Sequence, residues 1–365
     1  MKENKITVLA IETSCDDTGV AILEVLGTKK SPSFRVLSNV IASQIEIGKK
    51  YGGVFPAMAK REHEKNLGPT LETAMKEANV SEKKIDLIAV TNGPGLEPCL
   101  WVGVNFAKDL AKKWNVPIIP VNHIEGHILV NFLNPKNRPV DRSTGPAVAL
   151  VVSGGHTQLI LIKGMGKYEI LGETRDDAAG ECFDKCAKIL GLEYPGGPII
   201  AKLADELKAK SYKLKDSLPR PMMHTKDYDF SFSGLKTAVL YSWKKIKLNH
   251  NSSDSVENDL AKKQIAMSAE IQQAIIDVLL KKTIKAAKDY NAKTIILGGG
   301  VSANQELRKQ FQNSASQNNF DLIFPSPDLS TDNAVMIALA GFYNRKAATS
   351  DVAAIKADAN LRLGK

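Results

Sequence analysis

Two of the six histidines in this 365-residue chain lie four positions apart, in the segment NHIEGHIL at residues 122–129. Residues i and i+4 share one face of a helix, so His123 and His127 can direct their imidazoles at one metal ion. The HExxH pattern of zinc peptidases is absent, because Glu125 does not directly follow His123 and projects to the other side of the helix. The spacing therefore favours a metal site that lacks a peptidase's general base. Two ordinary histidines at a packing interface remain the alternative.

Two glycine-rich segments suggest a second kind of chemistry. LVVSGGHTQ (150–158) and LGGGVSAN (297–304) each follow an apolar strand, and backbone N–H groups exposed in such turns can bind an anion. Neither is a P-loop, because no Gly-Lys-Ser/Thr follows. We expect Ser153–Gly155 to lie against a phosphate or a phosphate-linked acyl group, and Asn304 to bond an adenosine. A tight turn with Asn304 as a helix cap explains the same residues equally well.

Several carboxylates accompany these segments. Such groups suit ribose hydroxyls or a role as a base, and most could equally cap helices or be solvated: Glu12, Asp16, Asp17, Asp176, Asp177, Glu181 and Asp184. Glu12 and Asp16 are the candidates for a general base. In LEYPGGPII (192–200), the absence of a side chain at Gly197 would let the backbone approach a ligand.

The elements that must position these residues follow one plan used twice. Residues 6–26 and 146–164 each predict a β-hairpin with a polar turn. In each half a strand, a glycine loop, a helix, a strand and a final helix follow, beginning near residue 85 and residue 292. Identity between the halves is negligible, so only the order of elements supports duplication, and chance could produce that order in an α/β protein. Two such lobes around an interlobe nucleotide cleft form the duplicated actin/hexokinase/Hsp70-like architecture.

The duplicated plan also indicates a third metal ligand. The counterpart of the histidine helix is TDNAVMIALAGFY (331–343), which has Asp332 at its start. If both helices open onto the cleft, Asp332 places an oxygen opposite the two imidazole nitrogens. Its competing role is that of a plain helix cap. Two histidines and one carboxylate leave coordination positions open, which suits Fe(II) or Zn(II) holding a substrate.

The composition sets broad limits. With 43% hydrophobic and 24% charged residues, the sequence is typical of a globular protein, and no apolar stretch is long enough to span a bilayer. The short basic N-terminus predicts a first strand and not a signal peptide.

Four cysteines without a C-x-x-C pair favour buried thiols in a reducing cytoplasm, over a half metal site at Cys182 and Cys186. A net charge of +9 invites a polyanionic partner once the fold supplies a reason for one.

The chain resembles the tRNA N6-adenosine threonylcarbamoyltransferase family, the Kae1/TsaD/Gcp group of the actin-like superfamily. The segments that carry the resemblance occur in this order: IETSCDDTGVAI, VNHIEGH, LVVSGGHTQL, DDAAGECFDK, YPGGP, DFSFSGLKT, GGGVSAN and TDNAVMIA. They run from residue 6 to about residue 345, nearly the whole chain. The resemblance implies a duplicated actin-like (ASKHA, ribonuclease H-like) α/β fold. We expect an N-terminal lobe at 1–144 with both histidines. A C-terminal lobe at 145–365 would carry a helical insertion, the glycine loops and the third metal ligand.

The same resemblance implies an activity. The family transfers the threonylcarbamoyl group from threonylcarbamoyl-AMP to N6 of the adenosine 3′ of the anticodon in tRNAs that read ANN codons, and releases AMP. Its metal ligands fall on His123, His127 and Asp332, and the metal is usually described as iron, sometimes zinc. Its substrate-binding positions fall on Val151, Val152, Ser153, Gly154, Gly155, Asp184, Gly197 and Asn304.

The family also implies partners. Bacterial members form a heterodimer with an inactive actin-like paralogue and work with a small P-loop ATPase, and the reaction is cytoplasmic. For tRNA contact, Lys244, Lys245 and Lys247 with Tyr241 and Trp243 are candidates, although an amphipathic solvated helix explains them nearly as well. Two rival functions remain, a metallopeptidase and a non-enzymatic ATP-binding scaffold of the Hsp70/actin type.

Overall fold

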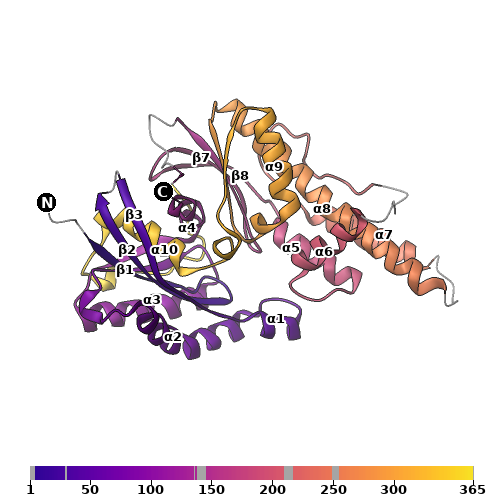
Figure 1. Cartoon of the computed structure of the whole chain (residues 1–365). Helices are drawn as coiled ribbons and strands as arrows, with labels where there is room; N and C mark the ends of the chain where they lie inside the picture. Colours follow the sequence, from indigo (N-terminus) through magenta and orange to yellow (C-terminus); the bar gives the residue numbers. More distant parts are fainter. Residues whose placement is uncertain are drawn as a thin grey trace. The chain divides into compact units, whose positions relative to one another are not determined.

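The computed structural model describes residues 5–28, 31–134, 136–137, 145–208, 217–248 and 255–364. The chain forms two compact α/β units, shown in Figure 1. Unit 1 comprises Met1–Ile47, Val54–Pro139 and Pro325–Lys365, and unit 2 comprises Gly48–Gly53 and Val140–Phe324.

Unit 1 is built on a five-stranded sheet with the order β3-β2-β1-β4-β5. The central strand β1 pairs antiparallel with β2 and parallel with β4. Residues 8–11 of β1 are wholly buried, as expected for an apolar strand covered on both faces. The strands are β1 (Ile6–Glu12), β2 (Asp17–Thr28), β3 (Ser31–Ser43), β4 (Leu87–Gly93) and β5 (Ile118–Asn122).

Helices cover both faces of this sheet. Helices α2 and α3 form one core with Leu9 and Ile11 of β1. Because side chains alternate along a strand, Glu12 points to the opposite face, where α10 packs on β1, β2 and β4. The helices that contribute to unit 1 are α1 (Ile45–Tyr51), α2 (Pro56–Ala78), α3 (Glu97–Trp114), α4 (His123–Leu129) and α10 (Ala334–Asn344). Its 3₁₀ turns are η1 (Glu82–Lys84), η2 (Val130–Leu133), η4 (Pro327–Leu329), η5 (Arg345–Ala347) and η6 (Val352–Ala354).

Unit 2 repeats the sheet of unit 1. Its strand order is β10-β9-β6-β7-β8, with β6 antiparallel to β7 and parallel to β9. Counting from the first strand of each half, the order is the same in both sheets, so the predicted duplicated actin-like plan is confirmed. The strands are β6 (Ala147–Val152), β7 (Thr157–Gly164), β8 (Lys167–Glu173), β9 (Thr294–Gly298) and β10 (Asp321–Ile323).

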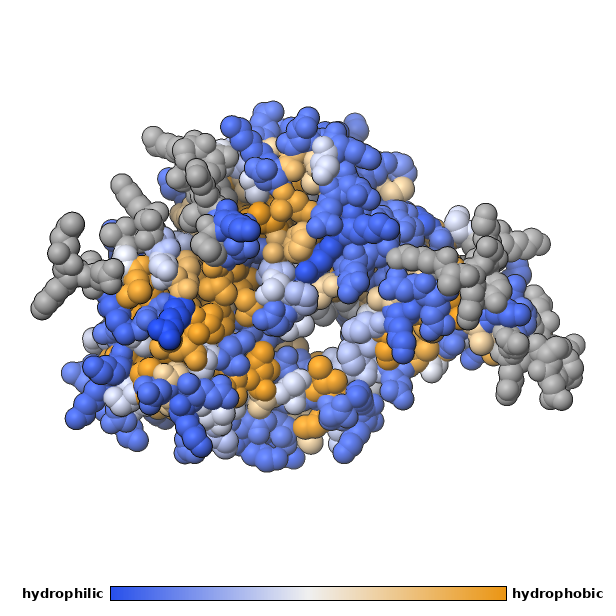
Figure 2. Space-filling model, in the orientation of Figure 1, coloured by the Kyte–Doolittle hydropathy of each residue, from blue (hydrophilic) through white to orange (hydrophobic). Residues whose placement is uncertain are grey.

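Long helices complete unit 2. Helix α8 carries an apolar stripe that is fully buried at Ile271, Ile275, Val278 and Leu279. Hydrophilic residues predominate over the visible surface of α8 and α9 in Figure 2. The helices are α5 (Ala179–Leu190), α6 (Gly196–Lys208), α7 (Ser233–Leu248), α8 (Ser255–Asp289) and α9 (Gln305–Gln317), with the 3₁₀ turn η3 (Gly300–Ala303). None of the helices in the described residues is long and apolar enough to cross a membrane.

The packing differs from the expected lobes in one respect. Residues 325–365, expected within a C-terminal lobe at 145–365, group with unit 1. The reason is that α10 is buried all round and needs the unit 1 sheet on one side and α4 on another. The expected boundary at residue 144 falls in 138–144, outside the described residues.

Candidate metal centre and glycine loops

Helix α4 carries the two histidines at its first and fifth positions. It follows β5 directly, and Asn122 caps it by accepting hydrogen bonds from the backbone N–H groups of Ile124 at 2.9 Å and Glu125 at 3.3 Å. The two imidazole rings lie edge to face, with centroids 4.7 Å apart. The cap and the i, i+4 spacing therefore place both rings together on a buried helix face.

Close backbone packing brings the start of α10 to this face. A Cβ atom on Gly126 of α4 would lie 3.1 Å from side-chain atoms of Met336 and Ile337. A Cβ atom on Gly19 would lie 3.2 Å from the backbone nitrogen of Ala334. Two glycines thus let α10 approach both α4 and the sheet. The helix cap is Asn333, whose Oδ1 accepts from the Met336 N–H at 3.1 Å, so Asp332 is not the N-cap.

The three expected ligands converge at one point. Asp332 Oδ1 lies 3.1 Å from His127 Nε2 and 3.5 Å from His123 Nε2. One potential ligand atom from each residue lies within 4.8 Å of the others. All three residues belong to unit 1, which corrects the expectation that Asp332 comes from the opposite lobe.

The burial of the histidines fits a metal ion. His127 is fully buried, and within the described residues neither of its ring nitrogens has a hydrogen-bond partner. Its 3.1 Å approach to Asp332 does not have the direction of a hydrogen bond. A buried imidazole without a hydrogen-bond partner is costly, and donation of its lone pair to a cation would remove that cost. Two imidazole nitrogens and a carboxylate oxygen are ligands that suit a divalent metal.

A buried carboxylate lies behind His123. Glu12 ends β1 and has no exposed surface. Its Oε2 accepts from Thr91 Oγ1 at 2.6 Å and lies 3.1 Å from His123 Nδ1, and its Oε1 accepts from the Ser14 N–H at 2.5 Å. Both oxygens are therefore engaged inside the protein. This geometry does not suit the general base expected at Glu12, because a base must reach its substrate.

The electrostatics of these groups follow from burial and mutual charge. Burial would raise the pKa of Glu12, but the His123 charge and the hydrogen bonds bring it below its ordinary value. Burial opposes the charged form of His123, yet Glu12 and Asp332 raise its pKa to about 9. For His127 burial prevails and lowers the pKa, which keeps this imidazole neutral, the form that binds metals.

The second expected base, Asp16, lies in the β1–β2 turn and is partly exposed. Burial, with a further contribution from the Asp332 charge, raises its pKa above the ordinary value. The neighbouring Asp17 is raised to about 7, again mainly by burial. A carboxylate with a raised pKa is a better proton acceptor near neutral pH than an ordinary aspartate.

Glu125 takes no part in this cluster. Its Oε2 accepts from Asn344 Nδ2 at 2.7 Å, at the far end of α10. The structure thus agrees with the sequence in giving the histidine helix no glutamate positioned as in a zinc peptidase.

The glycine loops lie in unit 2. The backbone N–H of Gly180, in the first turn of α5, donates to the Ser153 carbonyl at 3.1 Å, so the 153–155 turn adjoins the positive end of that helix. A Cβ atom on Gly154 or Gly155 would meet nothing within 4 Å. Val151 and Val152, by contrast, are wholly buried in β6. The two glycines of the turn are therefore exposed, whereas the side chains of the preceding strand are buried in the core.

The other expected substrate positions are mostly occupied by local structure. Asp184 Oδ1 accepts from the Gly196 N–H at 2.7 Å, which ties α5 to the start of α6 next to Gly197. Asn304 caps α9, accepting from the Leu307 N–H at 2.9 Å while its amide donates to Gln272 at 2.7 Å. Asn304 therefore acts as a helix cap, and its expected contact with an adenosine stays a prediction.

Comparison with known proteins decides the family. The family model TsaD, tRNA N6-adenosine threonylcarbamoyltransferase, matches residues 35–339. The protein of that name from Thermosipho africanus is 46% identical over 357 residues, 98% of this chain and 99% of the relative. The one from Syntrophomonas wolfei is 44% identical over 337 residues, 92% of each chain. The chain belongs to this family.

Solved structures support the fold assignment alone. HypF in a phosphate- and nucleotide-bound form aligns with 93% of this chain and 46% of its own, at a TM-score of 0.57 and 12% identity. HypF from T. kodakarensis gives a TM-score of 0.53 at 11% identity, over 93% of this chain and 48% of its own. This chain thus shares its fold with these proteins.

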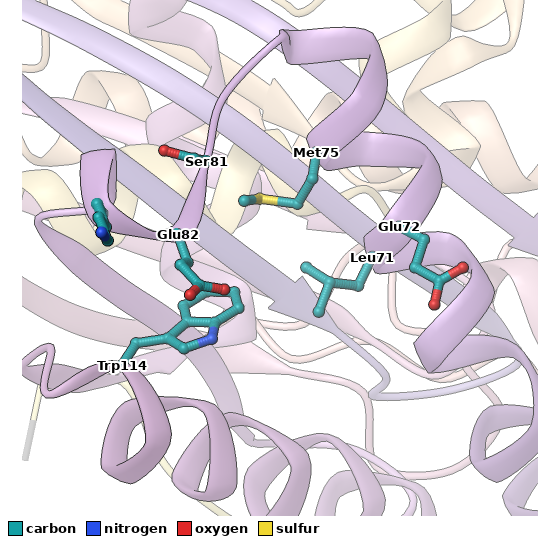
Figure 3. A pocket seen from close by; sticks show the side chains of 7 residues that line it. Leu71, Glu72, Met75, Ser81, Glu82 and Trp114 are labelled. Carbon is teal, nitrogen blue, oxygen red and sulfur yellow. The ribbon is translucent and has the colours of Figure 1, made fainter.

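Other features of the chain contribute no chemistry to the cluster. A surface hollow lies at the ends of α2 and α3 (Figure 3); its lining is Leu71, Glu72, Met75, Ser81, Glu82, Lys83 and Trp114, with neither histidine nor cysteine among them. The Sγ atoms of Cys182 and Cys186 are 3.9 Å apart and fully buried, as expected for structural thiols. Thr91, which holds Glu12, carried no signal in the sequence, because its contact depends on the register of β1 and β4.

Proposed function

We propose that this chain transfers the threonylcarbamoyl group of threonylcarbamoyl-AMP to N6 of the adenosine 3′ of the anticodon in tRNAs that read ANN codons. The products are N6-threonylcarbamoyladenosine and AMP. The observation that carries this proposal is 46% identity over nearly the full length of a relative with this activity in its name. The buried cluster of two histidines and an aspartate supports a metal-dependent reaction.

Neither rival function is favoured. A peptidase of the HExxH type requires a general base beside the first histidine, but Glu125 is bonded to Asn344 instead. A non-enzymatic scaffold needs no buried cluster of metal ligands, and the relatives are named as transferases.

His123, His127 and Asp332 would hold one divalent cation, which we propose to be iron or zinc. A bound cation supplies Lewis-acid polarisation of a carbonyl oxygen. The chain's own contribution is to fix the three ligand atoms before binding, because a cap on α4 and two glycines around α10 set their positions. Open coordination positions would then be available to the threonylcarbamoyl group.

The 153–155 turn would bind the phosphate of the adenylate. Its Gly154 and Gly155 N–H groups donate to no other group in the described residues, and the turn lies at the start of α5. Such N–H groups and the helix dipole favour an anion, and they would stabilise charge that develops on the departing AMP. Adenine N6 is a weak nucleophile, so orienting the two substrates would contribute most of the acceleration.

Asp16 is the residue we propose as acceptor of the proton that N6 loses. Its pKa is raised chiefly by burial, and it remains partly exposed, unlike Glu12. A base works only when deprotonated, so activity would fall as the pH drops through the raised pKa of Asp16. The Asp16→Asn variant should lose most of its kcat and show no such acid limb in its pH–rate profile. An unchanged profile in this variant would assign the proton to another acceptor.

The exposed face of α7 is the proposed tRNA contact. Lys244 and Lys245 are exposed, and Tyr241 is 66% exposed, whereas Trp243 is only 3% exposed and cannot stack on a base. Removal of one lysine that neutralises a phosphate should reduce the slope of log binding constant against log salt concentration by about one. K244E/K245E should therefore bind tRNA more weakly and with a shallower slope. The matched control is K112E/K113E, an exposed lysine pair in the last turn of α3. Equal losses in both pairs would mean that only net charge matters.

Partner proteins complete the proposal. An inactive actin-like paralogue would form a heterodimer with this chain, a small P-loop ATPase would assist it, and a tRNA substrate places the reaction in the cytoplasm. The test is reconstitution of the chain with these partners, metal, tRNA and threonylcarbamoyl-AMP, read by the mass of the modified nucleoside. We expect modified adenosine only with all substrates and a loaded metal site. Hydrolysed peptide without modified tRNA would overturn the proposal in favour of a peptidase.

A further inference from the structure

Glu12 stands out among the buried groups of unit 1, because it contacts a metal-ligand candidate without being one. Its side chain has no exposed surface, and it is not a member of the cluster of His123, His127 and Asp332. The carboxylate lies against Nδ1 of His123, whereas Nε2 of the same ring lies 3.5 Å from Asp332. The two nitrogens of one imidazole therefore face two different environments.

The position of Glu12 is fixed by the sheet. The parallel register that pairs Ile11 with Val90 brings Thr91 beside Glu12, and its hydroxyl donates to the carboxylate at 2.6 Å. The chain then turns so that the Ser14 N–H donates to the other oxygen at 2.5 Å. The turn itself is held to α3, where Thr13 Oγ1 donates to the Cys99 carbonyl at 3.0 Å. The carboxylate is thus anchored at both oxygens before it meets His123.

This contact determines which ring nitrogen carries the proton. An ionised carboxylate only accepts hydrogen bonds, so the close approach of Glu12 Oε2 to Nδ1 requires the hydrogen to sit on Nδ1. Ser14 Oγ, also 3.1 Å from Nδ1, can rotate its hydrogen away and accept as well. In the neutral imidazole, the form that binds a metal, Nε2 is then left with its lone pair, on the side of the ring where Asp332 and His127 lie.

We propose that Glu12 is a positioning residue for the metal centre: it holds the Nδ1 proton of His123 and thereby presents Nε2 as the ligand atom. Carboxylates that orient a metal-bound histidine in this way fix its tautomer and ring angle and raise its basicity. The arrangement is asymmetric, because His127 has no such partner among the described residues. This inference rests on the metal site of the proposed function but not on the transfer reaction.

The test uses metal affinity, with Zn²⁺ alone as the probe. The full chain is stripped of metal, and Zn²⁺ binding is measured by competition with a chromogenic chelator. Loss of such an outer partner typically weakens metal binding ~10- to 100-fold, which is the expectation for Glu12→Ala. Glu12→Gln keeps an oxygen that can accept from Nδ1, so its loss should be smaller, about several-fold. Thr91→Val frees the carboxylate from one anchor and should give a loss of about the same size as Glu12→Gln.

The matched control is Glu24→Gln. Glu24 is also a buried carboxylate of this sheet, on β2, but it pairs with Lys5 and lies opposite Thr7 at the other end of β1. Its variant should bind Zn²⁺ like the natural chain. Thermal unfolding of each metal-free variant separates weakened binding from a loss of fold, since binding energy adds only to the metal-loaded state.

A spectroscopic readout reports on the tautomer itself. In the Zn²⁺-loaded protein with ¹⁵N-labelled histidine, the His123 ring should show a proton on Nδ1 that exchanges slowly with water. That signal should persist in Glu24→Gln and be lost or broadened in Glu12→Ala. A merely structural role for Glu12 would change stability without moving this signal.

Two results would overturn the inference. One is a folded Glu12→Ala protein that binds Zn²⁺ within about twofold of the natural chain, a difference far below the expected loss. The other applies if Glu12→Ala does not fold: Glu12→Gln would then bind like Glu24→Gln. Either result leaves the transferase proposal standing, whereas wild-type protein that binds Zn²⁺ tightly but modifies no tRNA would contradict that proposal alone.

Discussion

The turns of the two equivalent hairpins are built for different tasks. The β1–β2 turn of unit 1 is closed: Thr13 and Ser14 are buried, and their hydrogen bonds fasten the turn to α3 and to Glu12. The β6–β7 turn of unit 2 is open: Gly154 and Gly155 are exposed, and a side chain there would meet nothing within 4 Å. One sheet plan thus carries a turn fastened by hydrogen bonds in one unit and an exposed glycine turn in the other.

The difference lies in residue type and not in topology. Both turns connect the first two strands of sheets with the same strand order. The carboxylate at the end of β1 accepts the Ser14 N–H and so draws the turn inward, whereas the two glycines after β6 are exposed and have open space around them. Metal ligation needs side chains held in place, and anion binding needs N–H groups left unsatisfied, so the sequence of each turn fits its proposed task.

The largest effect is expected at the cluster of His123, His127 and Asp332, beside the closed turn. His127→Ala removes a buried ligand and should weaken Zn²⁺ binding by ~100-fold or more, with transfer activity lost alongside, because two ligands hold a cation poorly. The control is His224→Ala, an exposed histidine of unit 2 that contacts Lys281. Chelator competition measures the first effect and nucleoside mass the second. Retention of full metal affinity by His127→Ala would place the cation elsewhere.

Substitution by alanine should distinguish a glycine without room for a side chain from one with open space around it. Gly299 has a φ of +84°, and a Cβ there would lie 2.3 Å from the Val152 carbonyl oxygen, whereas Gly154 has open space. Gly299→Ala should therefore lower the free energy of unfolding by about 2–4 kcal/mol, through strain and a clash. Gly154→Ala should change it by less than about 0.5 kcal/mol. Urea denaturation measures both values, and equal values would contradict the contrast.

Substitution in the open 153–155 turn should change the affinity for AMP. A methyl group at Gly154 should crowd the neighbouring N–H groups and weaken AMP binding by about several-fold, a loss of roughly 1 kcal/mol, while Zn²⁺ affinity stays unchanged. Isothermal titration with AMP on the metal-loaded chain measures the change. If Gly154→Ala binds AMP normally and Gly155→Ala does too, the phosphate does not lie on this turn.

The smallest effect concerns an exposed carboxylate of unit 2 that several hydrogen bonds hold in place. Asp176 of unit 2 accepts hydrogen bonds from Ser231, Phe232 and Ser233 at the start of α7. Partial burial would raise the pKa of Asp176, but these bonds lower it below its ordinary value. Its stabilising contribution is therefore present above the unfolded pKa, about 4, and is lost as the pH falls through the lower folded value.

Asp176→Asn should accordingly destabilise the chain at neutral pH by no more than about 1 kcal/mol, since solvent screens an exposed group. The difference from the natural chain should close below about pH 4, where the aspartate becomes protonated. Urea denaturation at several pH values measures it. A difference that grows toward acid pH would have the wrong sign for this cause.

Local patterns predicted much of the structure. Pairs of apolar strands around a polar turn identified both hairpins, and glycine runs identified both loops. The spacing of His123 and His127 predicted a shared helix face, because each of these patterns depends on short-range geometry. The order of elements then predicted the duplicated plan. The identity of the helix cap at 332–333 could not be predicted, since two adjacent polar residues compete and only the local backbone decides for Asn333.

Features that depend on tertiary packing were missed. No sequence pattern indicated that α10 packs outside its own half, because an apolar surface predicts that a helix is buried but not which elements bury it. The partners of Glu12 depend on the register of β1 and β4, strands separated by about 80 residues. Burial also removed Trp243 from the expected tRNA-binding residues, because its place on α7 faces the core.

The return of residues 325–365 to unit 1 has a consequence for biosynthesis. On the ribosome, both imidazoles emerge about 200 residues before the aspartate that completes their cluster, and the whole of α8 is made in between. A nascent chain therefore cannot bring these three side chains together until residue 332 has left the ribosome.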